Sequence, residues 1–417
     1  MRKAARFISL LTCGALLSGC GGLSAGSGSP APITVMTWAP EGTKATNMPG
    51  MPAMAEAYAR YINAKGGING HKLKVLTCNE HNDSVAVANC VDRASHAGAV
   101  AVVGSYSEHG ASFSAALETA GIPYIGGYGI TQEEFASPVS YPVNGGLPAL
   151  LAGNGQQLAA KCSKVSLVRP DTTAGDQFPG FLDAGLRNAG KSDATDLRAP
   201  DDATDYTSTA EQSIGNDASG QCVTAVLGDA TATFFDSFRR LRATDSGTGT
   251  EHAPRARIAS VLGSVTQSTV DSTGGATSPL EGALVTSWYP PSADTAWAPM
   301  KQVIQKYAFD DDRINADDPG VQTTWIAYTV FAQVVASLGH QAITATNVMR
   351  AFGSAHGIST GGLTPPLGWR DADLLPVPDL PRMVNGKVTY QVVRNGRLVA
   401  ARSGFADVSG TLETTPQ

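Results

Sequence analysis

Residues 99–131 alternate short apolar runs with loops rich in glycine and serine, and this alternation constrains the fold more than any other part of the chain. The run 99–103 is rich in valine and too short for a helix, so it predicts a buried parallel strand. Apolar residues at helical spacing predict a helix over 110–121, and the run 122–125 predicts a second strand. The stretch therefore indicates an open α/β sheet, in which ligands bind beyond the carboxyl ends of the strands.

The two loops that follow these strands carry groups suited to a small ligand. Ser107, Glu108 and His109 stand directly before the predicted helix, whose first backbone amides lack partners and favour an anion. After the second strand, Gly129 allows close approach of the backbone and Thr131 supplies a hydroxyl. The alternative is a pair of ordinary loops with no ligand.

Residues 1–20 are typical of a targeting segment and are set apart from the fold. Basic residues precede an apolar core that is too short to span a bilayer, and the segment ends in Leu-Ser-Gly-Cys. This ending resembles the lipobox of bacterial lipoproteins, so we expect Cys20 to be acylated and the protein to be anchored outside the cytoplasm. Residues 21–32 are expected to form a flexible tether. A plain secretory peptide with an incidental cysteine is the alternative.

Four cysteines follow the targeting segment, and an even number in an extracytoplasmic protein indicates disulfides. Three pairings are open. We favour Cys78 with Cys90, a short local loop, and Cys162 with Cys222, which ties together the beginnings of two strands. A metal site is the alternative, but neither CxxC spacing nor paired histidines accompany these cysteines, so no metal is expected.

Length and charge narrow the classes of function. The chain of 417 residues is long enough for two domains with ordinary cores. Its net charge of −6 and the lack of a Lys/Arg cluster after the targeting segment argue against nucleic acid and against a polybasic membrane patch. We find no GxSxG, HExxH, P-loop or dinucleotide motif, so neither an enzyme nor a cofactor is expected.

The run 61–70, YINAKGGING, precedes a strand, an acidic loop and a helix, and then Val-Gly-x-x-Ser and Gly-Ile-Pro-Tyr-Ile. In this setting the chain resembles the extracellular solute-binding proteins of ABC importers, of the branched-chain amino-acid (Leu/Ile/Val-binding-protein-like) type. The resemblance is strongest over 51–131 and weaker to about residue 398. It implies an α/β protein with the two-lobe type 1 periplasmic-binding fold, a parallel sheet flanked by helices in each lobe, and three hinge crossovers.

The expected lobes follow the crossovers. The first crossover is expected at 144–146, the second at 289–291, and 365–369 is expected to belong to the third. The resulting lobes are 33–143 plus 289–360 for the first, and 144–288 plus 361–417 for the second.

Two further segments carry strong local signals. Asn-Gly pairs at 385–386 and 395–396 are typical of type I′ turns and predict two hairpins over 383–401. The helix expected over 320–338 has a broad apolar stripe, which we interpret as core rather than as a ligand box.

The resemblance also implies roles for the first-lobe loops. Ser107, Glu108 and His109 stand where the family contacts its ligand, and Gly129 and Thr131 stand where it uses a main-chain group and a hydroxyl. In the family these groups hold the carboxylate of the ligand. Glu108 departs from that pattern, because a carboxylate there repels a carboxylate ligand unless it points away or meets a cation.

The matching loops of the second lobe offer Ala174, Asp229 and Ser264. The family commonly places an aromatic ring near the first of these and an acid near the last. Here Asp229, one loop away, is the candidate acid. We expect a pocket that differs from the usual one in the family.

These observations favour a lipid-anchored substrate-binding component of an ABC importer, which captures a small polar solute such as an amino acid, an amide or a related carboxylate. Its partners would be the solute and a membrane permease, and we expect a monomer. An extracellular sensor that passes occupancy to a membrane signalling partner is one alternative. An extracellular enzyme on the same scaffold is another.

Overall fold

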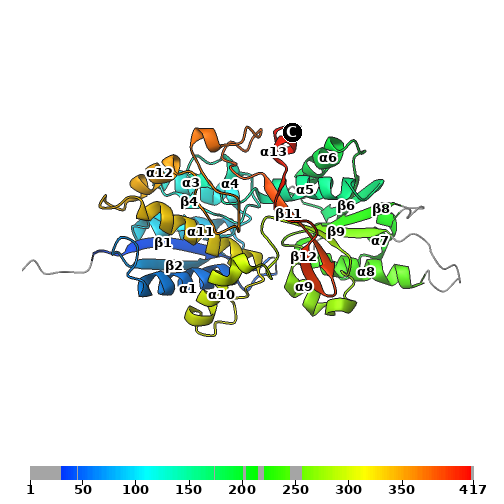
Figure 1. Cartoon of the computed structure of the whole chain (residues 1–417), viewed down its shortest axis with the longest axis horizontal. Coiled ribbons are helices and arrows are strands. Elements are labelled where there is room, and N and C mark those ends of the chain that lie inside the picture. Colours follow the sequence, from blue (N-terminus) through cyan, green and yellow to red (C-terminus); the bar gives the residue numbers. More distant parts are fainter. Residues whose placement is uncertain are drawn as a thin grey trace, which may run out of the picture.

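The computed structural model describes residues 30–414 except 45, 173, 201–202, 215–219 and 245–255. The targeting segment, Cys20 and most of the tether lie outside the described residues. The structure has two lobes side by side, joined through a central hinge (Figure 1).

The first lobe is built on a parallel sheet, which has five strands among the described residues, in the order β2-β1-β3-β4-β5. Strand β1 (Ile33–Ala39), which lies between β2 and β3, is buried along its whole length, because helices cover both faces of a parallel sheet. The other strands are β2 (Leu73–Asn79), β3 (Ala101–Val103), β4 (Tyr124–Ile125) and β5 (Ser140–Tyr141).

Helices enclose this sheet on both sides. One face packs against α1 (Gly50–Ala64), α10 (Ala298–Tyr307) and α11 (Pro319–Ala336). The other packs against α2 (Ser84–His96) and α3 (Gly110–Ala120). The apolar stripe of α11 is core as expected, with Tyr328 and Phe331 fully buried. Two shorter helices complete the lobe, α4 (Glu133–Ala136) and α12 (Ala345–Ser354).

The second lobe is built on a mixed sheet in the order β12-β11-β10-β9-β8-β6-β7, with β13 paired to β11. Its parallel part comprises β6 (Lys164–Pro170), β7 (Thr195–Ala199), β8 (Gln221–Ala225), β9 (Arg257–Val261) and β10 (Leu284–Ser287). Its antiparallel edge comprises β11 (Lys387–Arg394), β12 (Arg397–Ala400) and β13 (Ala406–Asp407).

The helices of the second lobe again form two layers. One face of the sheet packs against α5 (Gly146–Ala159) and α6 (Phe178–Asn188). The other packs against α7 (Thr207–Ile214) and α8 (Thr231–Thr244), with a cluster of phenylalanines from α8 at its centre. Two small helices lie at the margins, α9 (Gln267–Ser272) and α13 (Ser409–Glu413).

The hinge consists of three segments of the described chain that contact one another. Asn144, in the first segment, donates from Nδ2 to the hydroxyl of Tyr289 in the second at 3.1 Å. Asn385, in the third, donates from Nδ2 to the carbonyl of Val143 at 3.3 Å. Asn144 and Tyr289 belong to 144–146 and 289–291, the segments that the sequence assigns to the first two crossovers. The third passes through Asn385 and not through 365–369.

Residues 365–369 pack against the first lobe because Trp369 fills a space beside its last strand. The indole Nε1 of Trp369 donates to the carbonyl of Pro142 at 2.9 Å, and its ring meets that of Phe352 edge-on at 5.1 Å. The backbone of Arg382 bonds to Phe135 of α4 at 2.8 Å. The chain therefore contacts the first lobe up to about 383, which differs from the boundary at 361 expected above.

One of the two predicted hairpins forms. Asn395 and Gly396 both have positive φ, 52° and 70°, and connect β11 to β12. The prediction of a hairpin at 385–386 is wrong. The oxygen Oδ1 of Asn385 accepts from the backbone of Lys387, and this pair leads the hinge segment into β11.

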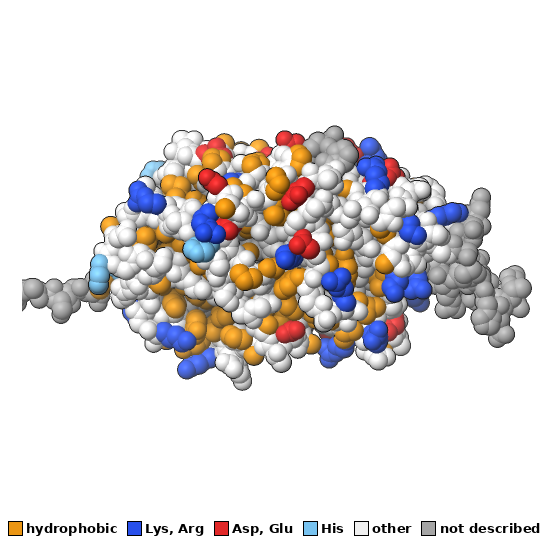
Figure 2. Space-filling view, turned by 45° about the horizontal axis from the view of Figure 1, so that its top comes forward, with side chains coloured by type: hydrophobic (Ala, Val, Ile, Leu, Met, Phe, Trp, Pro, Cys, Tyr) orange, Lys and Arg blue, Asp and Glu red, His pale blue; other side chains and the backbone are white. Residues whose placement is uncertain are grey.

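Both predicted disulfides form. Cys78 of β2 pairs with Cys90 of α2, and Cys162, just before β6, pairs with Cys222 of β8. In the part of the chain that the structure describes, no helix is both long and apolar enough to cross a bilayer. Figure 2 shows basic side chains spread singly or in small groups over one face, with acidic side chains between them.

Candidate functional site

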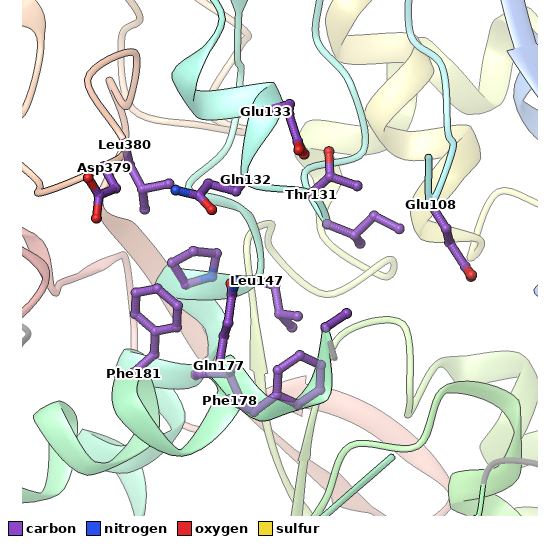
Figure 3. A pocket seen from close by; sticks show the side chains of 14 residues that line it. Glu108, Thr131, Gln132, Glu133, Leu147, Gln177, Phe178, Phe181, Asp379 and Leu380 are labelled. Carbon is purple, nitrogen blue, oxygen red and sulfur yellow. The ribbon is translucent and has the colours of Figure 1, made fainter. Parts of the chain in front are cut away.

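A groove open to solvent, with about 200 Å³ of space for a small molecule, lies between the lobes beside the hinge. Fourteen described residues line it, and we call it the inter-lobe groove (Figure 3). The first lobe contributes Glu108, Ile130, Thr131, Gln132 and Glu133. The second lobe contributes Leu147, Pro148, Leu151, Ala174, Gln177, Phe178 and Phe181, and the chain before the third crossover contributes Asp379 and Leu380.

The loop after β4 forms the first-lobe wall, and the carboxylate of Glu134 holds it in place. Oε2 of Glu134 accepts from the backbone of Gly129 at 2.9 Å. Oε1 accepts from the backbones of Ile130 and Thr131 at 2.9 and 3.1 Å, and from Oγ1 of Thr131 at 3.3 Å. The amide of Gly129 and the hydroxyl of Thr131, expected to bind the carboxylate of a ligand, therefore bond to a carboxylate of the chain itself.

Burial shifts the pKa of the Glu134 carboxyl upward. Glu134 is 3% exposed, and desolvation raises its pKa from 4.5 to about 7. The three backbone donors act in the opposite direction, because they stabilise the charged form. Tyr124 lies close by: a Cβ added to Gly127 would be 2.1 Å from Oε2 of Glu134 and 2.7 Å from Oη of Tyr124.

The neighbouring Glu133 begins α4, and its carboxylate lies against the first residue of α3. A Cβ added to Gly110, the first residue of that helix, would be 2.2 Å from Oε2 of Glu133 and 2.5 Å from Oγ1 of Thr131. Only glycine permits so close an approach. The unpaired amides of this helix end thus lie next to a carboxylate of the chain, which is the kind of group that a helix N-terminus favours.

The loop after β3 turns its polar groups inward. Ser107 is buried, and its Oγ donates to Oε2 of Glu80 at 3.2 Å and accepts from the backbone of His109 at 3.1 Å. Burial raises the pKa of Glu80. Glu108 is exposed and lines the groove, where one of its carboxylate oxygens accepts from the hydroxyl of Tyr106 at 2.9 Å.

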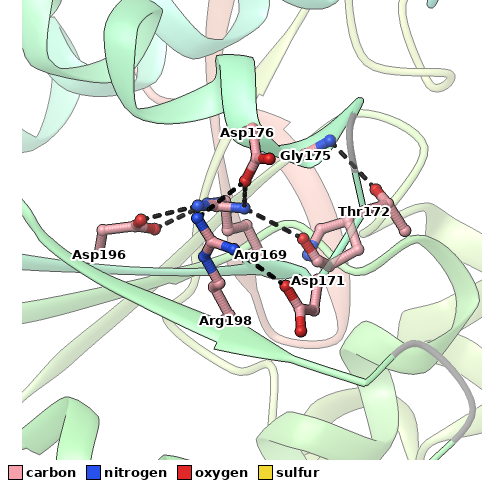
Figure 4. Close-up of polar contacts among 8 residues, drawn as sticks. Arg169, Asp171, Thr172, Gly175, Asp176, Asp196 and Arg198 are labelled. Carbon is pink, nitrogen blue, oxygen red and sulfur yellow. Dashed lines mark hydrogen bonds and ion pairs between the residues drawn. The ribbon is translucent and has the colours of Figure 1, made fainter.

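The second-lobe wall begins with a loop that an arginine holds at the end of β6 (Figure 4). The side chain of Arg169 is 2% exposed and forms two hydrogen bonds to Asp196 of β7, both of 2.8 Å. Its Nη1 donates to Asp176 at 2.8 Å, and Arg198 reaches the same carboxylate at 3.2 Å. This network fixes the loop that presents Ala174 and Gln177 to the groove.

Aromatic and aliphatic side chains form the floor of the groove. Phe178 and Phe181 are three residues apart on α6 and face the same side. Leu147 and Leu151 on α5 also line the groove, and Figure 3 shows Leu147 between the phenylalanines and the first-lobe loop. The groove thus combines an apolar floor with polar side chains at its edge.

Asp229 and Ser264 lie outside the lining of this groove. Both belong to the part of the cleft where the ring of Tyr128 meets the second lobe: a Cβ added to Gly263 would be 3.1 Å from the hydroxyl of Tyr128. Among the described residues this hydroxyl has no hydrogen-bond partner, although Tyr128 is only 4% exposed. Burial raises its pKa well above the usual value, and the charges of Asp318 and Asp229 act in the same direction.

The groove therefore brings together Glu108, Thr131 and Ala174 from the predicted set. The groove is not lined by the other predicted residues, Ser107, His109, Gly129, Asp229 and Ser264. Sequence reasoning missed the glutamates of α4 and the phenylalanines of α6. The adjacent Glu-Glu pair two residues after Thr131, and the three-residue spacing of the phenylalanines, are signals that could have drawn attention to them.

Two α/β lobes, a hinge and a groove lined from both sides define a two-lobed solute-binding protein of the type 1 periplasmic-binding fold. The sequence from 36 to 380 matches the periplasmic binding protein family, and the chain belongs to that family, whose members are solute receptors rather than enzymes. No relative is found among curated protein sequences.

Solved structures share the fold at low sequence identity. A substrate-binding periplasmic protein from Ralstonia solanacearum superposes with a TM-score of 0.70 at 14% identity, covering 88% of this chain and 99% of that one. A leucine-binding protein from Thermotoga maritima gives 0.67 at 13% identity, with coverage of 90% and 99%. A solute-binding protein of an ABC transporter from R. palustris, in complex with benzoate, gives 0.66 at 13% identity, with coverage of 90% and 96%.

Proposed function

We propose that the chain is the substrate-binding component of an ABC importer, which captures a small polar solute in the inter-lobe groove and presents it to a membrane permease. The groove itself carries the proposal, because Thr131 and Gln132 line it from one lobe and Gln177 and Phe178 from the other. A solute there would contact both lobes at once. Contacts made only when the lobes are together favour the closed form, which is the state that a permease would recognise.

The solute classes expected from the sequence are amino acids, amides and related carboxylates, and we propose that a solute of about their size enters this groove. The fold neighbours named for leucine and benzoate support a solute of this size. We also propose that the protein is held at the outer side of the membrane by a lipid on Cys20, on the strength of the Leu-Ser-Gly-Cys ending of 1–20.

A thermal-shift screen of the full chain in mild detergent tests the receptor role. At about a thousandfold excess over its dissociation constant, a true solute should add roughly 4 kcal/mol to the free energy of unfolding, seen as a rise in melting temperature. Thr131→Ala and Gln177→Ala, one on each lobe, should weaken a hit. Gln341→Ala, an exposed glutamine outside the groove, is the control.

Two outcomes would overturn this assignment. If no solute of these classes or of the amines tested below binds, the receptor role is wrong. If a hit binds both groove variants as tightly as the wild type, the groove is the wrong site. The anchor is tested separately: Cys20→Ser should move the protein from the membrane fraction to the soluble fraction, and an unchanged distribution would contradict lipidation.

A further inference from the structure

The two places where a sequence of this kind is expected to bind a carboxylate are already next to carboxylates of the chain. Glu134 accepts the backbone donors of residues 129–131 and the hydroxyl of Thr131. Glu133 lies against Gly110 at the start of α3. A ligand carboxylate placed at either point would have to displace a glutamate or lie beside one, and like charges at short range repel.

The charge of the groove has one sign. Its charged lining residues are Glu108, Glu133 and Asp379, and none of the fourteen described lining residues is a lysine or an arginine. Basic residues of the second lobe are engaged elsewhere: Arg169 and Arg198 bond to aspartates behind the loop that carries Ala174. Low-dielectric walls strengthen the field of such a groove, which concentrates cations and excludes anions.

The acidic residues near Tyr128 give the interior of the cleft a negative charge as well. Tyr106 donates to Glu108 and meets the ring of Tyr128 edge-on at 5.3 Å, so one ring separates the groove residue Glu108 from Tyr128. That hydroxyl lacks a partner among the described residues. Asp229 of the second lobe and Asp318 at the start of α11 both act on it electrostatically.

The floor of the groove offers apolar contacts to the solute. Phe178 and Phe181 present rings, and Leu147, Leu151 and Leu380 present aliphatic surface. Aromatic faces attract cations, and an apolar body of a solute gains free energy by leaving water.

We infer that the groove recognises its solute through a protonated amine and an apolar body, with Glu133 facing the cation and the α6 phenylalanines facing the body, and that it does not require a carboxylate. This inference rests on the proposed receptor function and changes its expected solute from a carboxylate to an amine. It makes Glu133 a specificity-determining residue, because it is the acid that lies both on the groove and at the helix end.

The test compares probes that share a carbon skeleton and differ in charge. One set is 2-phenylethylamine, phenylalanine and 3-phenylpropionate, and the other is pentylamine, norleucine and hexanoate. Isothermal titration calorimetry with the full chain in mild detergent measures the dissociation constants. In each set, the amine should bind at least about tenfold more tightly than the acid and the amino acid.

Three variants sharpen the comparison. Glu133→Gln should weaken binding of the amines by about tenfold while leaving the acids unchanged or slightly tighter. Glu133→Lys should reverse the preference within each set. Glu211→Gln, an exposed glutamate on α7 far from the groove in sequence, should change neither. The melting temperature of each variant shows whether it is folded. If Glu133→Lys does not fold, Glu133→Gln still tests the charge, because glutamine keeps the shape of the glutamate side chain.

The outcomes separate the two proposals. Tighter or equal binding of the acids or amino acids by the wild type would overturn the amine inference and leave the receptor function supported. Amine binding that Glu133→Gln does not change would overturn the role of Glu133. A failure of every probe, together with a failed screen, would overturn both the inference and the receptor function.

Discussion

Asn315 of the first lobe donates from Nδ2 to Oγ of Ser268 on α9 of the second lobe, at 2.7 Å. Both residues are exposed, and the bond crosses from one lobe to the other at a place outside the inter-lobe groove. Asn315 is itself held by its own turn, because its Oδ1 accepts from the backbone of Asp317 at 2.9 Å. The bond therefore joins two ordered surfaces and favours the arrangement in which the lobes are together.

Asn315→Ala should shift the lobes toward an open arrangement. An exposed hydrogen bond contributes about 0.5 to 1 kcal/mol, so the dissociation constant of a groove solute should rise about two- to fivefold. Calorimetry measures the constant, and small-angle X-ray scattering of the solute-free protein should give a larger radius of gyration. Asn89→Ala, an exposed asparagine on α2, is the control. Unchanged affinity and unchanged scattering would mean that this contact does not govern closure.

Glu134 should make stability depend on pH. Its pKa in the folded protein is about 7 and its usual value is 4.5, so the folded protein binds more protons than the unfolded chain between these values. This contribution is fully present below about pH 4.5 and is lost as pH rises through 7; its size is up to about 3 kcal/mol.

Glu134→Gln should flatten the fall in stability between pH 5 and 7, measured by urea unfolding at a series of pH values. Burial also raises the pKa of Glu80 and of Asp318, so a smaller slope of the same sign should remain. Wild-type and variant curves that run parallel would show that Glu134 titrates normally.

The Arg169 network should stabilise the second lobe. Arg169→Ala leaves Asp196 without its cation and Asp176 with Arg198 alone, and because both carboxylates are partly exposed the cost should be about 2 kcal/mol, below the range for a fully buried pair. Arg187→Ala removes an ion pair to Asp193 that is about half exposed on both sides, and should cost less than about 1 kcal/mol. Denaturant midpoints compare the two, and equal losses would contradict a special role for Arg169.

The two disulfides should differ in their effect on stability. The bond between Cys162 and Cys222 closes a loop of 60 residues, and the bond between Cys78 and Cys90 closes one of 12. The loop-entropy relation gives about 4 kcal/mol for the longer loop and about 3 kcal/mol for the shorter one. Replacing each pair by serines should therefore lower the melting temperature more for the long loop. The reverse order would show that effects in the native state outweigh the entropy of the unfolded chain.

The elements that sequence reasoning predicted well are those whose signal is local. The buried strand at 99–103, the helix at 110–121 and the turn at Asn395-Gly396 each depend on a few neighbouring residues, and all three appear at or near the expected positions. Asn385-Gly386 carries the same dipeptide as the real hairpin turn. It forms no hairpin because the third hinge segment, which bonds to Val143, takes up that part of the chain.

The site was predictable only in part, for the same reason. Thr131 and Ala174 reach the groove because strands of a parallel sheet all end at one edge, a rule that follows from topology. No such rule decides which group accepts hydrogen bonds from the backbone amides of 129–131. Ligand and Glu134 are both carboxylate acceptors, and which of them bonds there depends on the position of α4 after the chain has folded.

By itself, the sequence indicated the class of the fold, the two disulfides and the edge of each sheet where a ligand would lie. The reason is that hydrophobic spacing, cysteine positions and the order of strands and helices are all visible in the linear order of residues. Tertiary structure alone decided that Glu133 and Glu134 lie beside the expected anion sites and that the phenylalanines of α6 face them across the cleft. Packing brings these groups together from distant parts of the chain, and the resulting field and shape of the groove arise only from their positions in space.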